Sequence, residues 1–402
     1  MKKIPELLAP AGDMERLQFA LDYGADAVYL AGKSFGMRAG AGNFDEQGLT
    51  KALALVKTYG KRAFLTINAI PRDSDLNTLP DFLSFTQDLG IDALICADLG
   101  VFTLAGRYAP KIERHISTQA GILNTAAATA WHDLGAKRVI LARELSLNEI
   151  AHLRAHTPKD LEIEVFCHGA MCVSFSGRCL LSQYMVGRDA NQGNCAQPCR
   201  WKYHLVEATR PNATMEIIED GGTHIMNARD LSMIGHLQDL IDTGVDSLKI
   251  EGRAKSFYYA AVISNAYRKA LDALQSGQVV PAIWQNEVEK VSHRHYSTGF
   301  FYDENGGGEH YDDSSYIRGA QVVGVVEECD ALGNALISQR NRFLVGDTLE
   351  LLTPSDIPEQ FQVTDMTNEK DEPISVAPHP MMLLKLKLPH AAPKRSILRK
   401  NI

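Results

Sequence analysis

Several features of membrane, secreted and nucleic-acid-coating proteins are missing from this sequence. No stretch of about 18 apolar residues occurs in the 402-residue chain, which excludes an ordinary membrane-spanning helix. The start, MKKIPELLAPAGDMERLQ, lacks the unbroken apolar core of a signal peptide, so we expect a cytoplasmic protein without membrane contact. The formal net charge of −8 excludes a surface that is basic throughout, but it permits a local basic patch that grips one RNA.

The motifs of the common peptidases and nucleotide-binding enzymes are also missing. His152 and His156 have the spacing of H-E-x-x-H, but Leu153 stands where the glutamate is needed. The glycines of G-x-S-x-G do not surround Ser176, and Ala27 occupies the first glycine position of a phosphate loop. Because catalytic side chains can converge from distant parts of a chain, a peptidase stays an alternative function.

The first two-thirds of the chain repeats a short apolar strand followed by an amphipathic helix that ends at glycine. Unbroken apolar runs are typical of parallel strands that are covered on both faces. Eight units over about 270 residues predict a TIM-barrel-like (β/α)₈ domain of the α/β class over residues 1–275, with a doubly wound open sheet as the alternative. The predicted strands are Glu6–Ala9, Ala27–Leu30, Ala63–Asn68, Ala93–Ala97, Arg114–Thr118, Arg138–Ala142, Glu162–Phe166 and Ser247–Ile250.

The remainder of the chain has a different pattern. We expect a linker region over residues 276–315 and a small β-barrel domain over residues 316–402, where short apolar strands recur. An unusually long loop separates the seventh barrel strand from a helix expected to begin near Ser232. Because this loop leaves the carboxyl end of a strand, it lies where barrel enzymes build their active sites.

The long loop holds four of the seven cysteines. Cys172, Cys179, Cys195 and Cys199 are spaced C-x6-C-x15-C-x3-C within a predicted cysteine-rich insertion, residues 167–220. In a reducing compartment, clustered thiols bind metals or react more often than they form disulfides. The spacing is looser than that of structural zinc sites. It therefore favours a 4Fe–4S cluster, with zinc or redox-active thiols as alternatives.

Polar side chains near strand ends are candidates for the barrel mouth. His168, Lys249 and Glu251 are the candidate catalytic residues. His168 could instead support a cluster sulfur or be a core histidine, and the other two could form a structural ion pair. Arginine matches carboxylates through two parallel hydrogen bonds. The candidate substrate-binding residues share long polar side chains near the strand ends and the cysteines: Gln119, Arg143, Arg178, Arg200 and Arg253.

Cations and aromatic rings alternate after the last cysteine, in Arg200-Trp201-Lys202-Tyr203. Nucleic-acid bases stack on such rings while the cations meet phosphates, and a solvated strand is the alternative interpretation. The segment adds to the case for an RNA partner.

Several segments resemble the collagenase-like peptidase family of unassigned catalytic type. They are ELLAPAG near the start, EVFCHGAMC from Glu164, GRCLLS from Gly177, RDANQGNCAQPCRW from Arg188 and SLKIEGRAKSFYY from Ser247. The resemblance spans nearly the whole chain. Better understood bacterial members look like oxygen-independent hydroxylation factors that act on tRNA wobble uridine, a ribosomal cytidine or a ubiquinone precursor.

The segments are most similar to the tRNA-modifying branch of that family. The resemblance implies that the four cysteines hold an iron–sulfur cluster and that wobble uridine becomes 5-hydroxyuridine, with prephenate as co-substrate. Where some members of the ubiquinone branch have a cysteine near the position of Ser232, this chain offers Cys199. Two alternatives stay open: a collagenase-like peptidase, and an iron–sulfur, RNA-binding scaffold for a partner protein.

Overall fold

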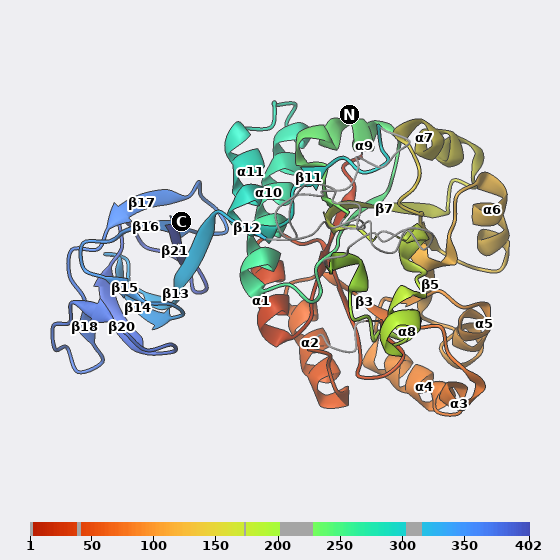
Figure 1. Ribbon diagram of the computed structural model, residues 1–402, viewed down its shortest axis with the longest axis horizontal. Helices are drawn as coiled ribbons and strands as arrows, with labels where there is room; N and C mark the ends of the chain where they lie inside the picture. The colour runs from red at the N-terminus through yellow and green to blue at the C-terminus, as the bar shows by residue number, and fades with distance from the viewer. Residues whose placement is uncertain (1–2, 38–41, 173, 202–227, 303–315) are drawn as a thin grey trace, which may run out of the picture.

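The computed structural model describes residues 3–37, 42–172, 174–201, 228–302 and 316–402 (Figure 1). The last third of the predicted cysteine-rich insertion, which includes Lys202 and Tyr203, lies outside the described residues, as does the end of the predicted linker. Two bodies are visible: a ring of helices around strands, and a smaller β domain at the C-terminal end, blue in Figure 1.

Eight parallel strands close into a barrel. They run in the order β1–β2–β3–β4–β5–β6–β7–β9, and β9 pairs with both β7 and β1, which closes the ring. The barrel is therefore confirmed and the open sheet is wrong. The strands are β1 Glu6–Pro10, β2 Ala27–Leu30, β3 Arg62–Ile67, β4 Ala93–Cys96, β5 Glu113–Ile116, β6 Arg138–Ile140, β7 Glu162–Ala170 and β9 Ser247–Ile250.

Helices surround the barrel, and many begin where the sequence supplies a capping side chain. Asp13, Asp45, Asp98, Asn124 and Ser146 each accept a backbone N–H in the first turn of the helix that follows. No helix in the described ranges is long and apolar enough to cross a membrane. The helices are α1 Met14–Asp22, α2 Glu46–Thr58, α3 Asp73–Leu76, α4 Leu79–Leu89, α5 Leu99–Tyr108, α6 Thr125–Asp133, α7 Leu147–His156, α8 Leu181–Val186, α9 Leu237–Asp242, α10 Phe257–Gln275 and α11 Ala282–Glu287.

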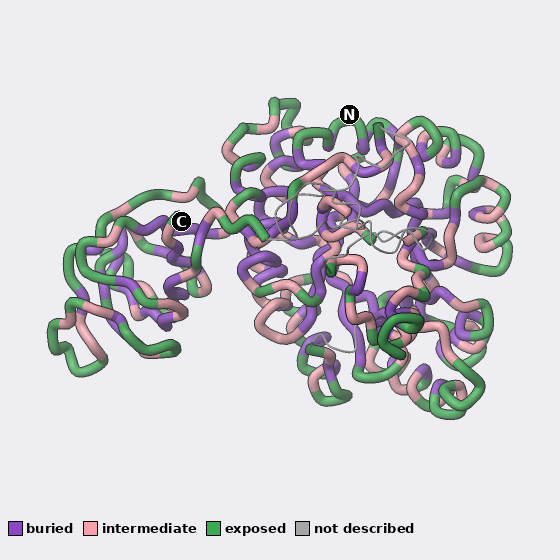
Figure 2. Tube along the Cα trace, in the orientation of Figure 1, coloured by how far each residue is buried: buried purple, intermediate pink, exposed green. Residues whose placement is uncertain are grey.

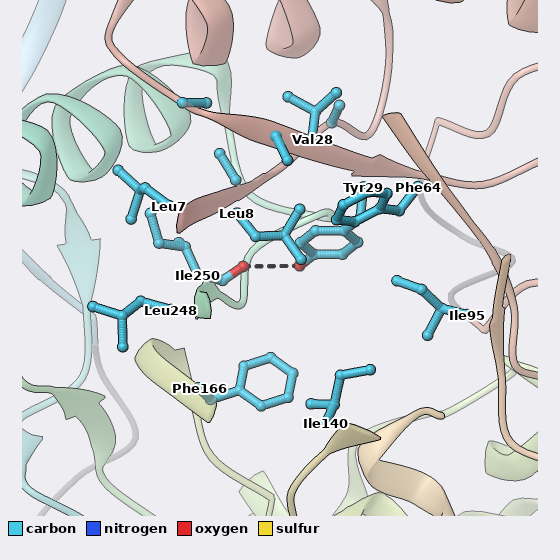
Figure 3. Packing of buried hydrophobic residues seen from close by; sticks show 14 of the residues in the cluster. Leu7, Leu8, Val28, Tyr29, Phe64, Ile95, Ile140, Phe166, Leu248 and Ile250 are labelled. Atoms are coloured by element: carbon cyan, nitrogen blue, oxygen red, sulfur yellow. Dashed lines mark hydrogen bonds between the residues drawn. The ribbon is translucent and has the colours of Figure 1, made fainter. Parts of the chain in front are cut away.

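The barrel interior is filled by side chains. Figure 3 shows Tyr29, Phe64, Ile140 and Phe166 pointing toward one another from different strands, and the Tyr29 hydroxyl donates to the Ile250 carbonyl at 2.9 Å. In Figure 2 the strands are buried while the outer faces of the helices are exposed. The barrel is thus a packed core and not a pore, so a ligand is expected at its mouth.

β7 is longer than predicted and carries a bulge. Its register with β9 shifts between Phe166 and His168, and beyond that point it pairs antiparallel with β8, Asp230–Ser232. β11, Tyr296–Ser297, then pairs with β8. The prediction of a helix beginning near Ser232 is wrong because Ser232 pairs in β8; α9 begins at Leu237 after a 3₁₀ turn.

The described part of the predicted linker belongs to the barrel domain. α11 packs against α10, and Phe301 lies in the main apolar core with the barrel strands. β10, Ser292–His293, pairs with β12, Ile317–Arg318. The region is therefore a structured extension of the barrel and not a spacer.

The C-terminal β-rich domain is confirmed. Seven antiparallel strands lie in the order β17-β16-β21-β13-β14-β20-β18, and β15 pairs with β19. The strands are β13 Ala320–Cys329, β14 Asn334–Gln339, β15 Phe343–Leu344, β16 Thr348–Leu352, β17 Glu359–Gln362, β18 Thr367–Asn368, β19 Val376–Ala377, β20 Leu383–Lys387 and β21 Ile397–Asn401.

Candidate functional site

A cavity of about 370 Å³ opens at the carboxyl-terminal mouth of the barrel. Its lining comes from the ends of several strands, including Thr66, Gln119, Arg143 and Glu251, and from the cysteine segment after β7. Pockets for small ligands typically measure about 300 to 1,000 Å³. Position and size together make this cavity the candidate active site.

All four predicted cysteine ligands line the cavity. Cys172 follows β7, Cys179 precedes α8, and Cys195 and Cys199 lie after it. The backbone N–H of Leu181 donates to Sγ of Cys179, and that of Gln197 donates to Sγ of Cys195, both at 3.3 Å. Hydrogen bonds of this kind tune thiolate ligands of iron–sulfur clusters.

The chain between these cysteines is bent through left-handed backbone. Gly193, just before Cys195, has φ of 86°, where glycine has no steric penalty. Gln197 has φ of 59° and is followed by Pro198, a combination that positions Cys199 but strains a residue with a side chain. Backbone strain of this kind concentrates at functional sites.

The four cysteine thiols line one cavity, but they are not arranged as the ligands of one metal ion. In the described ranges, no three Cys, His, Asp or Glu side chains stand together as ligands of one metal ion. Burial raises the pKa of Cys199, although the charge of Arg200 opposes this shift. Four clustered thiols match an iron–sulfur cluster in donor type and number.

Positive charge dominates the rest of the lining. Five cations, Arg143, Arg188, Arg200, Lys249 and Arg253, face the cavity, against one carboxylate, Glu251, among the described lining residues. The chain as a whole has a net charge of −8, so the cavity locally reverses the sign. Such a cavity attracts anionic ligands.

Lys249 and Glu251 both line the cavity, as their alternation along β9 predicted. Nζ of Lys249 lies 3.3 Å from Oε1 of Glu164 and 4.6 Å from the centre of the Tyr29 ring. Burial lowers the pKa of Lys249, and Glu164 opposes this shift. Burial raises the pKa of Glu164, but the charges of Lys249 and Arg138 outweigh it and hold that pKa below its ordinary value.

Three predicted substrate-binding residues lie at the cavity wall with defined partners. The Arg143 guanidinium lies 4.2 Å over the Phe166 ring and donates to the Ala170 carbonyl at 2.8 Å. Its buried Nε has no hydrogen-bond partner in the part of the chain that the structure describes. Arg253 is buried and donates to the Thr66 hydroxyl at 2.9 Å. Gln119 accepts a hydrogen bond from Asn68 at 2.9 Å.

The other two predicted substrate-binding residues differ in position. Arg200 lines the cavity, where it donates to the Tyr316 hydroxyl at 2.7 Å. Arg178 is not among the described lining residues; its Nε donates to the backbone carbonyl of Gln119. Arg178 therefore anchors the cysteine segment to the barrel.

His168 is corrected from a catalytic candidate to a core histidine. It is buried outside the cavity lining, with Nδ1 3.3 Å from the Tyr267 hydroxyl and Nε2 3.2 Å from the Tyr296 hydroxyl. Burial lowers its pKa to about 3. The bulge between Phe166 and His168 breaks the in–out alternation of β7, so the ring points away from the barrel interior.

Three further side chains support the site, and sequence reasoning missed two of them, Asp230 and Arg294. Glu144 accepts hydrogen bonds from the backbone N–H and the hydroxyl of Ser176 at 2.6 and 2.7 Å, which pins the cysteine segment. Asp230 and Arg294 form a buried ion pair at 2.6 Å behind Cys172. Asp230 and Arg294 are 64 positions apart, and no local sequence pattern links them. Arg188 also lines the cavity; it is close to the cysteines in sequence and could have been predicted as a cavity residue.

Two family models match the chain in order. Residues 12–310 match Peptidase family U32, and residues 318–399 match the Peptidase family U32 C-terminal domain. The chain belongs to peptidase family U32. This confirms the resemblance found in the cysteine segment.

Relatives of this U32 protein carry names of two kinds. It is 36% identical over 407 residues to tRNA hydroxylation protein P1 of Bacillus subtilis, which covers 99% of this chain and 95% of the relative. It is 36% identical over 420 residues to tRNA hydroxylation protein P of Escherichia coli, with 93% and 91% covered. It is also 31% identical over 310 residues to a protein of Porphyromonas gingivalis named collagenase, with 74% and 73% covered.

Proposed function

We propose that this U32 protein hydroxylates the wobble uridine of tRNA to 5-hydroxyuridine without molecular oxygen, with an iron–sulfur cluster and prephenate. The observation that carries the proposal is that four cysteines and five cations meet at one barrel-mouth cavity. It is supported by 36% identity, over nearly the full chain, to a protein named for tRNA hydroxylation.

Each group of cavity residues has a task in this proposal. Prephenate carries two carboxylates, and the guanidinium groups of Arg143 and Arg253 suit them because each offers several N–H donors in a fixed plane. The Arg143 Nε, buried without a described partner, is the donor that a carboxylate would satisfy. Lys249 is the candidate proton donor at the same wall, since burial lowers its pKa, and Glu251 lines the cavity beside it.

The cluster would be held by Cys172, Cys179, Cys195 and Cys199. When bound, it supplies electron transfer or Lewis acidity at the cavity. The protein's own contribution is to hold the uracil base of the RNA and the co-substrate side by side and to keep bulk water from the reacting atoms.

The test is nucleoside mass spectrometry of tRNA from a deletion strain grown without air, with and without the gene restored. Growth without air removes any oxygen-dependent route to the same product. We expect 5-hydroxyuridine and its derivatives to disappear on deletion and to return with the intact gene. Unchanged amounts in the deletion strain would show that the substrate is not tRNA wobble uridine.

One relative's name, collagenase, supports a second candidate function. The cavity offers little for it: no histidine is among the described lining residues, and the Ser176 hydroxyl is bound to Glu144. A serine or cysteine peptidase needs a base beside its nucleophile. Gelatin cleavage by the purified chain, lost on changing one cavity residue, would favour the peptidase.

A third candidate is a scaffold that binds a cluster and RNA for a partner enzyme. It differs from the proposed enzyme in one measurable respect. The purified, cluster-loaded chain would bind the RNA yet form no 5-hydroxyuridine until the partner protein is added.

A further inference from the structure

The cysteine segment exposes apolar side chains beside the cavity. We call Phe175, Leu180, Tyr184, Met185 and Val186, which lie on and just before α8, the α8 rim. The side chain of Tyr184 is 90% exposed, that of Leu180 71% and that of Phe175 45%. Figure 2 shows the tube at the position of α8 as exposed, and Figure 1 places α8 over the strand ends.

α8 reverses the usual pattern of a surface helix. It buries the polar Ser182, whose hydroxyl accepts the backbone N–H of Ala196 at 3.0 Å, and turns its apolar residues outward. A surface helix normally turns its apolar face toward the core. Contiguous exposed apolar side chains mark a surface that contacts a partner.

The α8 rim lies directly beside the cationic cavity. Cys179, just before α8, and Arg188, just after it, both line the cavity. α8 packs on the 3₁₀ turn Pro198–Arg200, which brings Arg200 and the 40% exposed Trp201 to the same region. Aromatic rings and guanidinium groups therefore lie in the same region beside the cavity.

We infer that the α8 rim docks the unpaired bases of an RNA loop, with Tyr184 as a stacking platform for a nucleotide next to the base that enters the cavity. The inference rests on the proposed function and deepens it. Single-stranded RNA is bound by aromatic rings that stack on bases together with cations that meet phosphates. Charge complementarity selects this occupant over a protein, because two guanidinium groups that line the cavity, those of Arg188 and Arg200, lie next to the apolar surface and can meet phosphates.

The experiment measures binding of an unmodified anticodon stem-loop RNA to the purified, cluster-loaded chain. Three variants are compared with wild type: Tyr184→Ala, Tyr184→Phe and the control Val279→Ala, an 89% exposed apolar residue between α10 and α11. Loss of one base–ring stack weakens binding by about 5- to 150-fold. We expect that loss for Tyr184→Ala only, because phenylalanine keeps the ring.

Iron content and melting temperature of each variant show whether the fold and the cluster are intact, and 5-hydroxyuridine in complemented cells gives a second readout. If wild type modifies tRNA and Tyr184→Ala binds the RNA as tightly as wild type, the surface inference is wrong and the proposed function stands. A second result would also overturn the inference. Tyr184→Ala could keep its RNA affinity but lose modification, and added partner protein could restore that modification. In that case the α8 rim docks a protein and not RNA. Absence of both RNA binding and modification in wild type would remove the proposed function and this inference together.

Discussion

Cys179 and Cys195 are the sulfurs best prepared as ligands, because each accepts a backbone N–H from two residues further along the chain. Such hydrogen bonds fix the direction in which each sulfur points and tune it as a ligand. We predict that Cys179→Ser abolishes both bound iron and 5-hydroxyuridine formation, since the replacement removes a soft ligand. Iron per chain and nucleoside mass spectrometry measure the two effects.

The matched control is Cys329→Ser. Cys329 is a free cysteine of the C-terminal domain and is not among the described residues that line the cavity. The substitution should leave iron and modification at wild-type amounts. A Cys179→Ser chain that modifies tRNA fully without iron would refute the cluster assignment.

His168 makes a prediction about stability and pH. Its pKa in the folded chain is about 3, whereas an unfolded histidine titrates near 6.5. Below about pH 6.5 this histidine is therefore protonated in the unfolded chain but not in the folded chain. The free energy of unfolding consequently falls by about 1.4 kcal/mol for each unit by which the pH is lowered. His168→Gln lacks this contribution. The difference in free energy of unfolding between wild type and His168→Gln should therefore shrink by about 2 kcal/mol when the pH is lowered from 7 to 5.

Urea unfolding at pH 7 and 5 measures that difference. His152→Gln, a change of an exposed histidine on α7, should keep the wild-type response to pH. If the difference in free energy of unfolding is the same at both pH values, His168 is exposed to solvent or has partners other than Tyr267 and Tyr296.

Among the elements, β8 connects the site to the rest of the chain. It pairs with the end of β7, and its Asp230 meets Arg294, whose Nη2 also donates to the Met171 carbonyl at 3.3 Å. Burial raises the pKa of Asp230, but Arg294 and Lys255 outweigh it and keep that pKa below its ordinary value. The carboxylate thus stays charged and holds the residue before Cys172 in place.

We predict that Asp230→Asn lowers stability by about 3–5 kcal/mol, because a buried guanidinium loses its counter-charge. Amide hydrogen exchange should quicken in β8 and at residues 168–171. Glu327→Gln, which removes one partner of an exposed pair with Lys394, should change neither quantity noticeably. Equal exchange in Asp230→Asn and wild type would show that β8 is held by its strand pairing alone.

The elements also show what the sequence could and could not predict. Strands such as Ala27–Leu30 and Ser247–Ile250 were predicted with their observed bounds, because apolar runs between polar turns are local signals. β8 and β11 are too short for a periodicity, and their partners are distant in the chain. Such pairing leaves no local pattern.

The candidate site shows the same division. The cysteines, Lys249 and Glu251 could be placed at the mouth because they lie near or after the carboxyl ends of strands. His168 could not be placed, since a bulge is decided by the pairing of β7 with β9. Its one local sign is Gly169, where φ is 114° and a Cβ would lie 2.3 Å from the Glu251 carbonyl. The close approach of the two strands requires glycine there.

At the scale of the whole molecule, the two domains share an apolar seam. Val325, Leu352 and Ile397 of the β domain belong to the main core cluster of the barrel, while most of the β domain packs around its own core. The Tyr23 hydroxyl of α1 donates to the Leu352 carbonyl at 3.0 Å. The β domain is therefore held against the side of the barrel and not over its mouth.

Arg399 is the polar centre of that seam. It is fully buried on β21, bonds both carboxylate oxygens of Glu287 on α11 at 2.7 and 2.8 Å, and donates to Glu350 at 2.8 Å. We predict that Arg399→Met lowers stability by about 3–5 kcal/mol, because two buried carboxylates lose their counter-charge. Lys400→Met removes a neighbouring, partly exposed ion pair with Asp347 and should have a small effect. Calorimetry of both variants decides the matter: equal melting temperatures for the two would mean that the apolar seam alone, without Arg399, holds the β domain on the barrel.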